Sequence, residues 1–369
     1  MRNWEKDSIT LNGCLYGKDN LNELLKPYES SDLWNSAIYN FLEDWFDKSA
    51  TITVHTSGST GKPKDIQLTK TAMRNSARMT NAFFGLNTHS IALLCLPADY
   101  IAGKMMLVRA IEGQFNLITV EPNAKPFANL NQSIDFTAIT PYQLAHSLED
   151  IKLLENKKIE IGKIIVGGAK INSETEAFVQ QLNVAVFETY GMTETCSHIA
   201  LRAVNGQNKS EFFSVLEGIA IRKNENNCLC IKAPHILSEE LITNDIVELV
   251  DDNHFKIIGR LDNIINSGGV KINPETIEKK LEKHINKPFF ITSLPDEFLG
   301  SKVVLVIELA TPSMLIQAEM KIIIDSFLEK FERPKEIIIV PRFCYSATNK
   351  LLKSETLALR NNNNRTYIS

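Results

Sequence analysis

Short apolar runs alternate with longer segments of helical spacing between about residues 91 and 187. The run 91–96 is continuously apolar, which is typical of a strand buried on both faces of a parallel sheet. Pro141 predicts the first turn of a helix, and Ser173, with Glu176 three residues on, predicts a helix cap. Strands that alternate with helices favour a parallel sheet covered by helices. Further strands are expected at 116–120, 136–140, 163–166 and 184–187, and further helices at 71–84 and 103–111.

The pattern changes on both sides of this region. Residues 1–50 predict mainly helices, because the apolar residues of 32–46 recur at helical spacing. From 212 to 258, short runs without long helices predict a small β-rich subdomain. A second unit begins near residue 259. Its helices are expected at 274–285 and 318–331, and its strands at 302–309 and 336–340.

These patterns predict an α/β fold in two domains. The first, residues 1–261, combines helix-covered, mostly parallel sheets with the β-rich subdomain. The second, residues 262–369, is a small α+β domain. A chain of 369 residues is long enough for two domains with substantial cores.

Composition narrows the function classes. A formal net charge of −4 gives no electrostatic reason to expect nucleic acid or an anionic membrane as partner. No apolar run approaches the roughly 18 residues of a membrane span, and the polar N-terminus lacks a signal-peptide core. Six cysteines in a chain of this length suggest no disulfide framework. We expect a cytoplasmic protein with small-molecule partners and no membrane insertion, and both a monomer and a homo-oligomer stay open.

The segment 56–64 carries the clearest chemical signal. It follows an apolar run and combines hydroxyls, glycines and lysines, which are suited to cradle a polyanion. It is no Walker loop, because only two residues separate its glycines and Pro63 follows the first lysine. A flexible Ser/Gly linker is the plainer alternative. The candidate phosphate-binding residues are Thr56, Ser57, Gly58, Ser59, Thr60, Gly61, Lys62 and Lys64.

Two further polar clusters follow predicted strands, at 167–170 and 188–195. In open parallel sheets, ligands sit at the carboxyl ends of the strands. Tyr190 can stack on a base, Thr193 can bind phosphate, and Glu194 can hold Mg²⁺ on phosphate oxygens. Each residue alone is more often part of a turn than of a site. Together with the loop at 56–64, they favour a nucleotide site.

From about residue 50 to 355 the chain resembles the adenylate-forming enzymes, which include acyl-CoA and aryl-CoA ligases, luciferases and nonribosomal adenylation domains. Five separated motifs carry the resemblance, and they occur in the family's order. They are Thr56-Ser57-Gly58-Ser59-Thr60-Gly61-Lys62-Pro63-Lys64, Tyr190-Gly191-Met192-Thr193-Glu194, Thr243-Asn244-Asp245, the segment 259–272, and Ala347-Thr348-Asn349-Lys350-Leu351.

The resemblance implies how the chain handles ATP, Mg²⁺ and CoA. The loop at 56–64 would handle the β- and γ-phosphates, Thr193 the α-phosphate, and Glu194 the metal. Lys350 would be catalytic in adenylation, on a mobile C-terminal lid domain. Further implied residues are Gly168 and Tyr190 for adenine, Ala169 and Gly191 for cofactor binding beside them, Asp245 and Arg260 for ribose, Asp262 as hinge, and Gly268, Gly269 and Lys271 for the CoA step.

The chain also departs from the family pattern. Asn349 and Asn244 each replace a common glycine, and the phosphate loop begins nearer the N-terminus than in typical members. We therefore expect an N-terminal domain that is trimmed relative to the family, which leaves the upstream part of the acyl pocket open. Asn tolerates left-handed backbone geometry better than most residues, so we expect the Lys350 loop to survive.

Within the family, the chain looks most like the ligases that convert o-succinylbenzoate to its CoA thioester for menaquinone biosynthesis. That acid has two carboxylates, and a cation must hold one while the other reacts. Lys104 and Arg109 are the candidates, with His198 at the pocket border. The plainer readings are solvated helix residues and a structural histidine. An aryl- or fatty-acid–CoA ligase and a catalytically inactive nucleotide-binding protein remain as alternatives.

Overall fold

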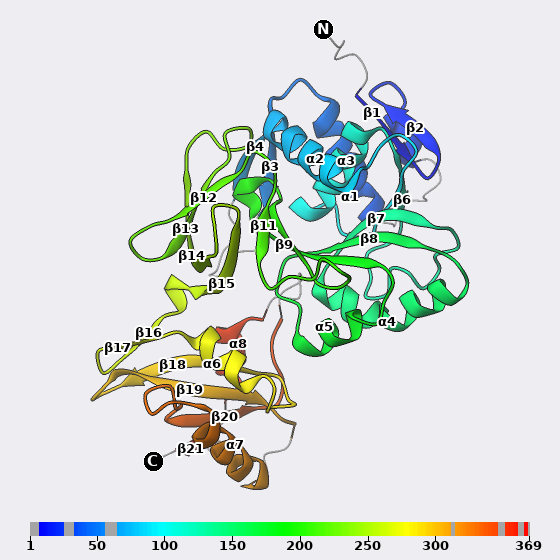
Figure 1. Ribbon diagram of the computed structural model, residues 1–369. Helices are drawn as coiled ribbons and strands as arrows, with labels where there is room; N and C mark the ends of the chain where they lie inside the picture. The colour runs from blue at the N-terminus through cyan, green and yellow to red at the C-terminus, as the bar shows by residue number, and fades with distance from the viewer. Residues whose placement is uncertain are drawn as a thin grey trace. The chain divides into compact units, whose positions relative to one another are not determined.

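Two units make up the chain in the computed structural model, which describes residues 7–25, 33–55, 65–310, 314–345, 351–360 and 365–367. The first unit comprises Met1–Ile221, Ile231–Leu241 and Asp251–His254. The second comprises Arg222–Cys230, Ile242–Val250 and Phe255–Ser369 (Figure 1). The domain boundary predicted between residues 261 and 262 separates the main domain from a mobile lid domain. It stays a prediction.

A run of parallel strands forms the centre of the first unit. The strands β9, β8, β7, β5 and β6 lie side by side in this order, and each neighbouring pair is parallel. Beyond β9, the strands β10 and β11 continue the sheet in antiparallel fashion. The mostly parallel sheet is therefore confirmed. The strands are β5 (Ile91–Leu94), β6 (Asn116–Thr119), β7 (Ile134–Ile139), β8 (Ile161–Val166), β9 (Ala185–Gly191), β10 (His198–Ala203) and β11 (Phe213–Val215).

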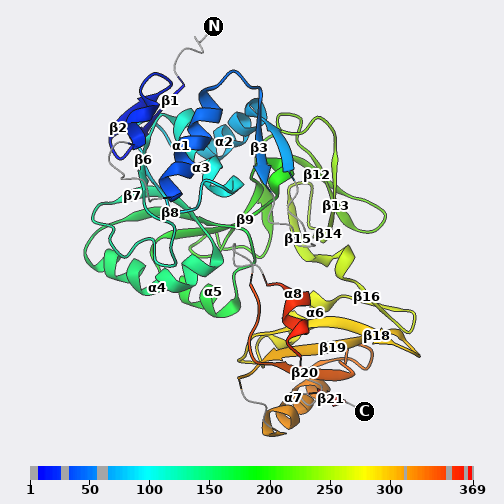
Figure 2. The same cartoon turned by 180° about the vertical axis from the view of Figure 1, so that it is seen from behind.

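Helices cover both faces of this sheet, as predicted. Helices α1 (Leu33–Phe46), α2 (Lys70–Phe84) and α3 (Ile101–Gly113) lie on one face, and α4 (Pro141–Asn156) and α5 (Ser173–Val179) lie on the other (Figure 1, Figure 2). Every residue of α3 from Met105 to Ile111 is buried. A helix that is apolar all round belongs in a protein interior. The one charged residue in this stretch, Arg109, is buried with it.

The prediction for the N-terminus was wrong for its first residues. Strands β1 (Ser8–Leu11) and β2 (Cys14–Gly17) form an antiparallel hairpin, and β1 also pairs with β6. The turn between them is Asn12-Gly13, with φ values of 50° and 80°. Asn-Gly is the sequence preferred by a type I′ hairpin turn, since both central residues need positive φ. The strands are too short for apolar alternation to reveal them.

The predicted start of α4 is confirmed, whereas the predicted cap of α5 is wrong. Pro141 occupies the first turn of α4, which Thr140 caps. Helix α5, in contrast, is capped by Asn172 rather than Ser173, because the Asn172 side chain accepts a hydrogen bond from the Thr175 backbone at 2.7 Å. Asn and Ser are both good caps, so composition alone does not choose between neighbours.

A two-stranded sheet of β3 (Thr51–His55) and β4 (Asp65–Thr69) flanks the predicted phosphate loop. His55 and Asp65 form the last register pair before that loop. The predicted residues of the loop, Thr56 to Gly61, Lys62 and Lys64, lie outside the described residues.

The predicted β-rich subdomain consists of four adjacent strands in the order of the chain. They are β12 (Ala220–Lys223), β13 (Cys228–Lys232), β14 (Leu241–Leu249) and β15 (His254–Arg260). Strands β14 and β15 are antiparallel, and their register places Asp245 opposite Arg260. This pairing brings together two residues that lie in separate motifs of the sequence.

The C-terminal part of the second unit is α+β, as predicted. Strand β19 (Gly300–Glu308) is buried on both faces from Val303 to Ile307. Its residues Val303, Leu305 and Ile307 pack with α6 and α7, whereas Val304 and Val306 pack on the other face near α8. The other elements are β16 (Ile265–Ser267), β17 (Val270–Ile272), α6 (Pro274–Leu281), β18 (Phe289–Asp296), α7 (Met314–Phe327), β20 (Glu336–Val340), α8 (Lys353–Ala358) and β21 (Arg365–Tyr367). None of the helices in the described ranges has the length and apolar character needed to cross a membrane.

Candidate active site

The loop after β8 presents open backbone at the carboxyl edge of the sheet. A Cβ at Gly167 would lie 2.5 Å from the Thr189 hydroxyl, so only glycine fits there. Gly168 has a φ of +93° and open space around it, and Ala169 is exposed beside it. Backbone without side chains can approach a flat ligand closely. The predicted adenine-binding position therefore fits the local geometry.

A buried ion pair that the sequence did not reveal anchors this loop. Glu188 accepts a hydrogen bond from the Ile171 backbone at 3.0 Å and from Arg202 Nε at 2.8 Å. Arg202 also binds both carboxylate oxygens of Glu176, at 3.0 and 3.1 Å. Glu188 and Arg202 are opposite each other in the register of β9 and β10. The sequence would have indicated this ion pair only if β10 had been predicted as an antiparallel neighbour of β9.

The motif after β9 folds into a tight turn. A Cβ at Gly191 would lie 2.2 Å from the Ser197 carbonyl oxygen, so glycine lets β9 and β10 approach. The Thr195 hydroxyl accepts from Met192 N at 3.0 Å and donates to the Ser197 carbonyl at 2.7 Å. These bonds hold a short 3₁₀ helix, Thr193–Thr195. Thr193 is half-buried and Glu194 exposed, so both side chains are accessible to a ligand.

Tyr190 is buried, with its ring centroid 6.0 Å from that of Phe213.

For a metal, the described residues bring together no group of three or more His, Cys, Asp or Glu side chains. Mg²⁺ on a nucleotide needs only one or two protein carboxylates, because the phosphates and water supply the rest. The single exposed Glu194 fits that kind of site and no all-protein metal cage.

Arg109 and His198 are linked through Ser197 in the interior of the first unit. Arg109 donates from Nη2 to the Ser197 hydroxyl at 2.7 Å and from Nη1 to the Met106 sulfur at 3.5 Å. The Ser197 hydroxyl lies 3.3 Å from His198 Nδ1, and the Thr80 hydroxyl lies 3.3 Å from His198 Nε2. Ser197 and Thr80 were missed, although Ser197 directly precedes His198 in the sequence.

The cluster around Arg109 is electrostatically unbalanced. Arg109 is 1% exposed and Nε has no partner in the described part of the chain. Burial lowers the pKa of Arg109 to about 9, which leaves it charged at neutral pH. Burial, together with the charge of Arg109, holds the pKa of His198 well below its ordinary 6.5. The cluster thus holds one positive charge and a neutral imidazole.

Lys104 does not join this cluster. Its ammonium donates to the Ala98 carbonyl at 2.8 Å and lies 5.2 Å from the centre of the Phe41 ring. Burial lowers its pKa, while Asp99 and Asp44 oppose the shift. Lys104 and Arg109 therefore face different neighbours from one helix, and only Arg109 accompanies His198.

In the second unit, the predicted ribose-binding residues form an ion-paired group. Arg260 Nη1 lies 3.1 Å from Asp245 Oδ1, and Arg260 Nη2 lies 3.1 Å from Asp262 Oδ2. Partial burial acts to raise the pKa of Asp262, but Arg260 outweighs it and lowers the pKa. The predicted hinge residue is thus tied to a predicted ribose ligand by two hydrogen bonds.

The predicted CoA-step residues lie on a hairpin. Strands β16 and β17 pair with Ser267 opposite Val270, which leaves Gly268 and Gly269 as a two-residue turn. Their φ values of 58° and 84° explain why both are glycines. Lys271 is exposed on β17, opposite Asn266. The predicted catalytic Lys350 lies outside the described residues.

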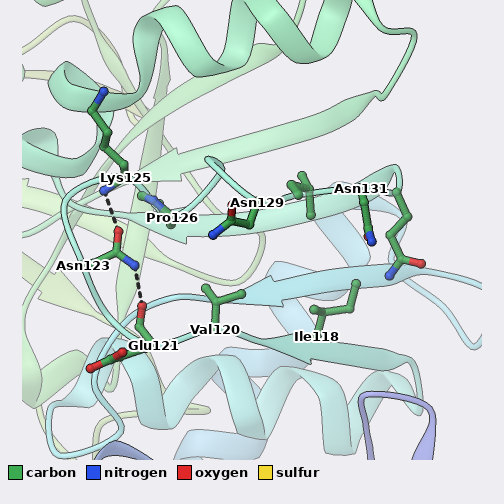
Figure 3. A pocket seen from close by; sticks show the side chains of 10 residues that line it. Ile118, Val120, Glu121, Asn123, Lys125, Pro126, Asn129 and Asn131 are labelled. Carbon is green, nitrogen blue, oxygen red and sulfur yellow. Dashed lines mark hydrogen bonds between the residues drawn. The ribbon is translucent and has the colours of Figure 1, made fainter.

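A hollow elsewhere in the first unit involves none of the predicted site residues. It lies at the end of β6 and is lined by ten residues between Ile118 and Gln132, among them Val120, Asn123 and Asn129 (Figure 3). Within its loop, Asn123 donates to the Glu121 carbonyl at 2.8 Å and accepts from Lys125 N at 2.7 Å. The polar groups of this loop therefore partly satisfy one another.

Residues 12–221 match the family model described as AMP-binding enzyme. The match covers more than half of the chain, and the chain belongs to this family. The enzyme class that the motifs predicted, an AMP-forming acid–thiol ligase, is confirmed with it.

Several relatives carry a more particular name. The 2-succinylbenzoate–CoA ligase of Geobacillus sp. (strain WCH70) is 25% identical over 349 residues, which are 86% of this chain and 70% of that protein. The 2-succinylbenzoate–CoA ligase of Escherichia coli (strain K12) is 26% identical over 302 residues, which are 78% of this chain and 64% of that protein. The chain thus spans about two thirds of the length of these relatives.

Solved structures share the fold. An acyl-CoA synthetase (AMP-forming)/AMP-acid ligase II-like protein from Dyadobacter fermentans is 37% identical, with a TM-score of 0.58, over 91% of this chain and 97% of that one. The o-succinylbenzoate CoA synthetase of Bacillus subtilis, in complex with its acyl-adenylate intermediate, is 21% identical, with a TM-score of 0.66, over 82% of this chain and 68% of that one. The same synthetase is also known in complex with ATP and magnesium ion.

Proposed function

We propose that this protein is an ATP-dependent carboxylate–CoA ligase whose acid is o-succinylbenzoate, in menaquinone biosynthesis. In the first step, a carboxylate oxygen bonds to the α-phosphorus of ATP and pyrophosphate leaves with the electron pair of the broken P–O bond. In the second, the CoA sulfur bonds to the acyl carbon, the thiol proton is released and AMP leaves. The names of the curated relatives support this choice of acid.

The observation that carries the choice of acid is the buried guanidinium of Arg109. No acidic side chain of the described residues perturbs its pKa or accepts its hydrogen bonds. A buried charge without a counter-charge is costly, and an arginine binds a carboxylate with two parallel hydrogen bonds. A dicarboxylic acid brings one carboxylate to Arg109 while the other reacts. A monocarboxylic acid has only the group that is consumed.

The remaining roles follow the family motifs. In the first unit, we assign the backbone at Gly168 and Ala169, with Tyr190 and Gly191, to adenine, and Thr193 to the α-phosphate. Mg²⁺ held by Glu194 would neutralise phosphate charge as the anionic carboxylate approaches.

For the second unit, we assign Asp245 and Arg260 to the ribose and Asp262 to the hinge. Lys350 is the catalytic cation of adenylation, because it adds positive charge where charge develops. Gly268, Gly269 and Lys271 form the face used with CoA. The six free thiols agree with a cytoplasmic location.

The test is pyrophosphate release with ATP and Mg²⁺, with and without CoA, on a panel of acids. The panel contains o-succinylbenzoate, benzoate, cinnamates and fatty acids. We expect a strong preference for o-succinylbenzoate and turnover that depends on CoA. Activity with another acid would keep the mechanism and reject the pathway. If no acid of the panel leads to pyrophosphate release, the result would instead favour an inactive nucleotide-binding protein.

A further inference from the structure

Four buried or half-buried side chains form a continuous hydrogen-bonded chain in the first unit. It runs from Thr80 on α2 through His198 and Ser197, at the start of β10, to Arg109 on α3. We call these four residues the Arg109 chain. Only Arg109 and His198 belong to the substrate residues that the sequence suggested.

The direction of each hydrogen bond in the Arg109 chain can be derived. Thr80 donates its only hydroxyl proton to the Ser76 carbonyl at 3.1 Å, so toward His198 it can only accept. His198 must then carry its proton on Nε2, and Nδ1 is left as an acceptor. Ser197 accepts from Arg109 and is free to donate to Nδ1. One tautomer of a neutral imidazole is therefore compatible with all three hydrogen bonds that link the four residues.

This arrangement orients the guanidinium through one strong contact. The bond from Arg109 Nη2 to Ser197 is 2.7 Å, whereas the other contact is a weak one to the Met106 sulfur. Nε has no partner in the described residues. An arginine with a purely structural role normally has its donors satisfied, as buried polar groups generally do. The unpartnered Nε–H of Arg109 is therefore a donor that a ligand could use.

We propose that Ser197 is a positioning residue, held by His198 and Thr80, that turns Arg109 toward a carboxylate of the acid substrate. The proposal rests on the proposed function, because it needs an acid with a second carboxylate. Ser197 touches no reacting atom in this account. It sets the angle at which Arg109 meets the ligand, and a misplaced binding group weakens binding without altering the chemistry of the other carboxylate.

The first test is a double-mutant cycle on the KM of the preferred acid. Ser197→Ala should raise KM for o-succinylbenzoate about tenfold with kcat and the KM for ATP nearly unchanged. Ser197→Thr, which keeps a hydroxyl, should restore KM. In an Arg109→Met background, Ser197→Ala should add nothing, because it acts through Arg109. Ser326→Ala is the matched control, since it removes a hydroxyl bonded only to its own exposed helix.

The second test needs no activity. Long-range ¹H–¹⁵N correlation spectra of the full chain report which ring nitrogen of each histidine carries the proton, and His198→Gln identifies the His198 signals. The wild type should show the Nε2–H tautomer. Thr80→Val removes the acceptor for that proton, and it should shift His198 toward the other tautomer. An unchanged spectrum would overturn the Arg109 chain as drawn.

The outcomes separate this proposal from the proposed function. If the wild type prefers another dicarboxylic acid, the assignment to menaquinone biosynthesis is rejected, and the double-mutant cycle is measured with that acid. If Ser197→Ala and Arg109→Met act additively, the positioning role falls while the ligase stands. If only monocarboxylic acids turn over, both the choice of acid and the role of Ser197 are overturned.

Discussion

Two buried arginines of the first unit differ in their counter-charges. Arg202 is 8% exposed and bonded to the carboxylates of Glu176 and Glu188. Arg109 is 1% exposed and bonded to a hydroxyl and a sulfur. Burial alone would lower the pKa of Arg202, but the two carboxylates raise it, whereas nothing offsets the burial of Arg109. Arg202 has its counter-charges in the folded chain, whereas for Arg109 we propose that an anionic ligand supplies the counter-charge.

The largest expected effect comes from breaking the complete pair. Arg202→Met removes the cation and leaves Glu188 buried without its partner. Losing one member of a buried ion pair costs about 3–5 kcal/mol of unfolding free energy. Urea denaturation followed by circular dichroism measures the loss. A change below about 1 kcal/mol would mean that Glu188 finds solvent or another donor, and the contrast between the two arginines would weaken.

The same substitution at Arg109 should affect binding instead of stability. Arg109→Met leaves no carboxylate behind, so the free energy of unfolding should stay the same or rise. The KM for o-succinylbenzoate should rise about 10- to 150-fold, which corresponds to the 1.5–3 kcal/mol of hydrogen bonds to charged groups. Denaturation and steady-state kinetics on the same preparation give both values. A large loss of stability would show that Arg109 is structural like Arg202.

The pH dependence of stability sharpens the contrast further. His198 stays neutral in the folded chain because its pKa lies well below 6.5, with burial as the main cause and Arg109 as the second. At a pH between the lowered pKa of the folded chain and the ordinary 6.5 of the unfolded chain, His198 binds a proton only in the unfolded chain. Stability should therefore fall as the pH drops below about 6.5, by up to about 1.4 kcal/mol per pH unit. His198→Gln should flatten this slope, and equal slopes in both proteins would contradict the assignment.

The sequence predicted one of these two arginines and missed the other, for a physical reason. Arg109 was predicted as a ligand residue, together with Lys104, because a dicarboxylic acid needs a cation to hold its second carboxylate. The ion pair of Arg202 becomes evident only from the register of β9 and β10, which places Arg202 opposite Glu188. The predicted parallel strands and covering helices followed from local apolar patterns. The hairpin of β1 and β2 and the pairing of β10 depend on turns and long-range partners that such patterns do not contain.

The same limit applies within the candidate site. Asp245 and Arg260 belong to separate motifs, and only the β14–β15 register makes them neighbours. Thr80 is 118 residues from His198 in the chain, so no sequence spacing indicates their contact. Residue types with family motifs around them were predictable. The groups that orient them were not, because orientation is a property of packing.

The smallest expected effect concerns the helix that carries Glu176, one of the two partners of Arg202. Asn172 caps α5 through its bond to the Thr175 backbone, so Asn172→Ala leaves that donor unsatisfied and frays the first turn, where Glu176 lies. Loss of a cap costs about 1 kcal/mol, and Ser173→Ala, one residue along, should cost much less. Urea denaturation of both variants compares them directly. If the two costs are equal, α5 does not depend on its cap to present Glu176, and the Arg202 pair is held by its strands alone.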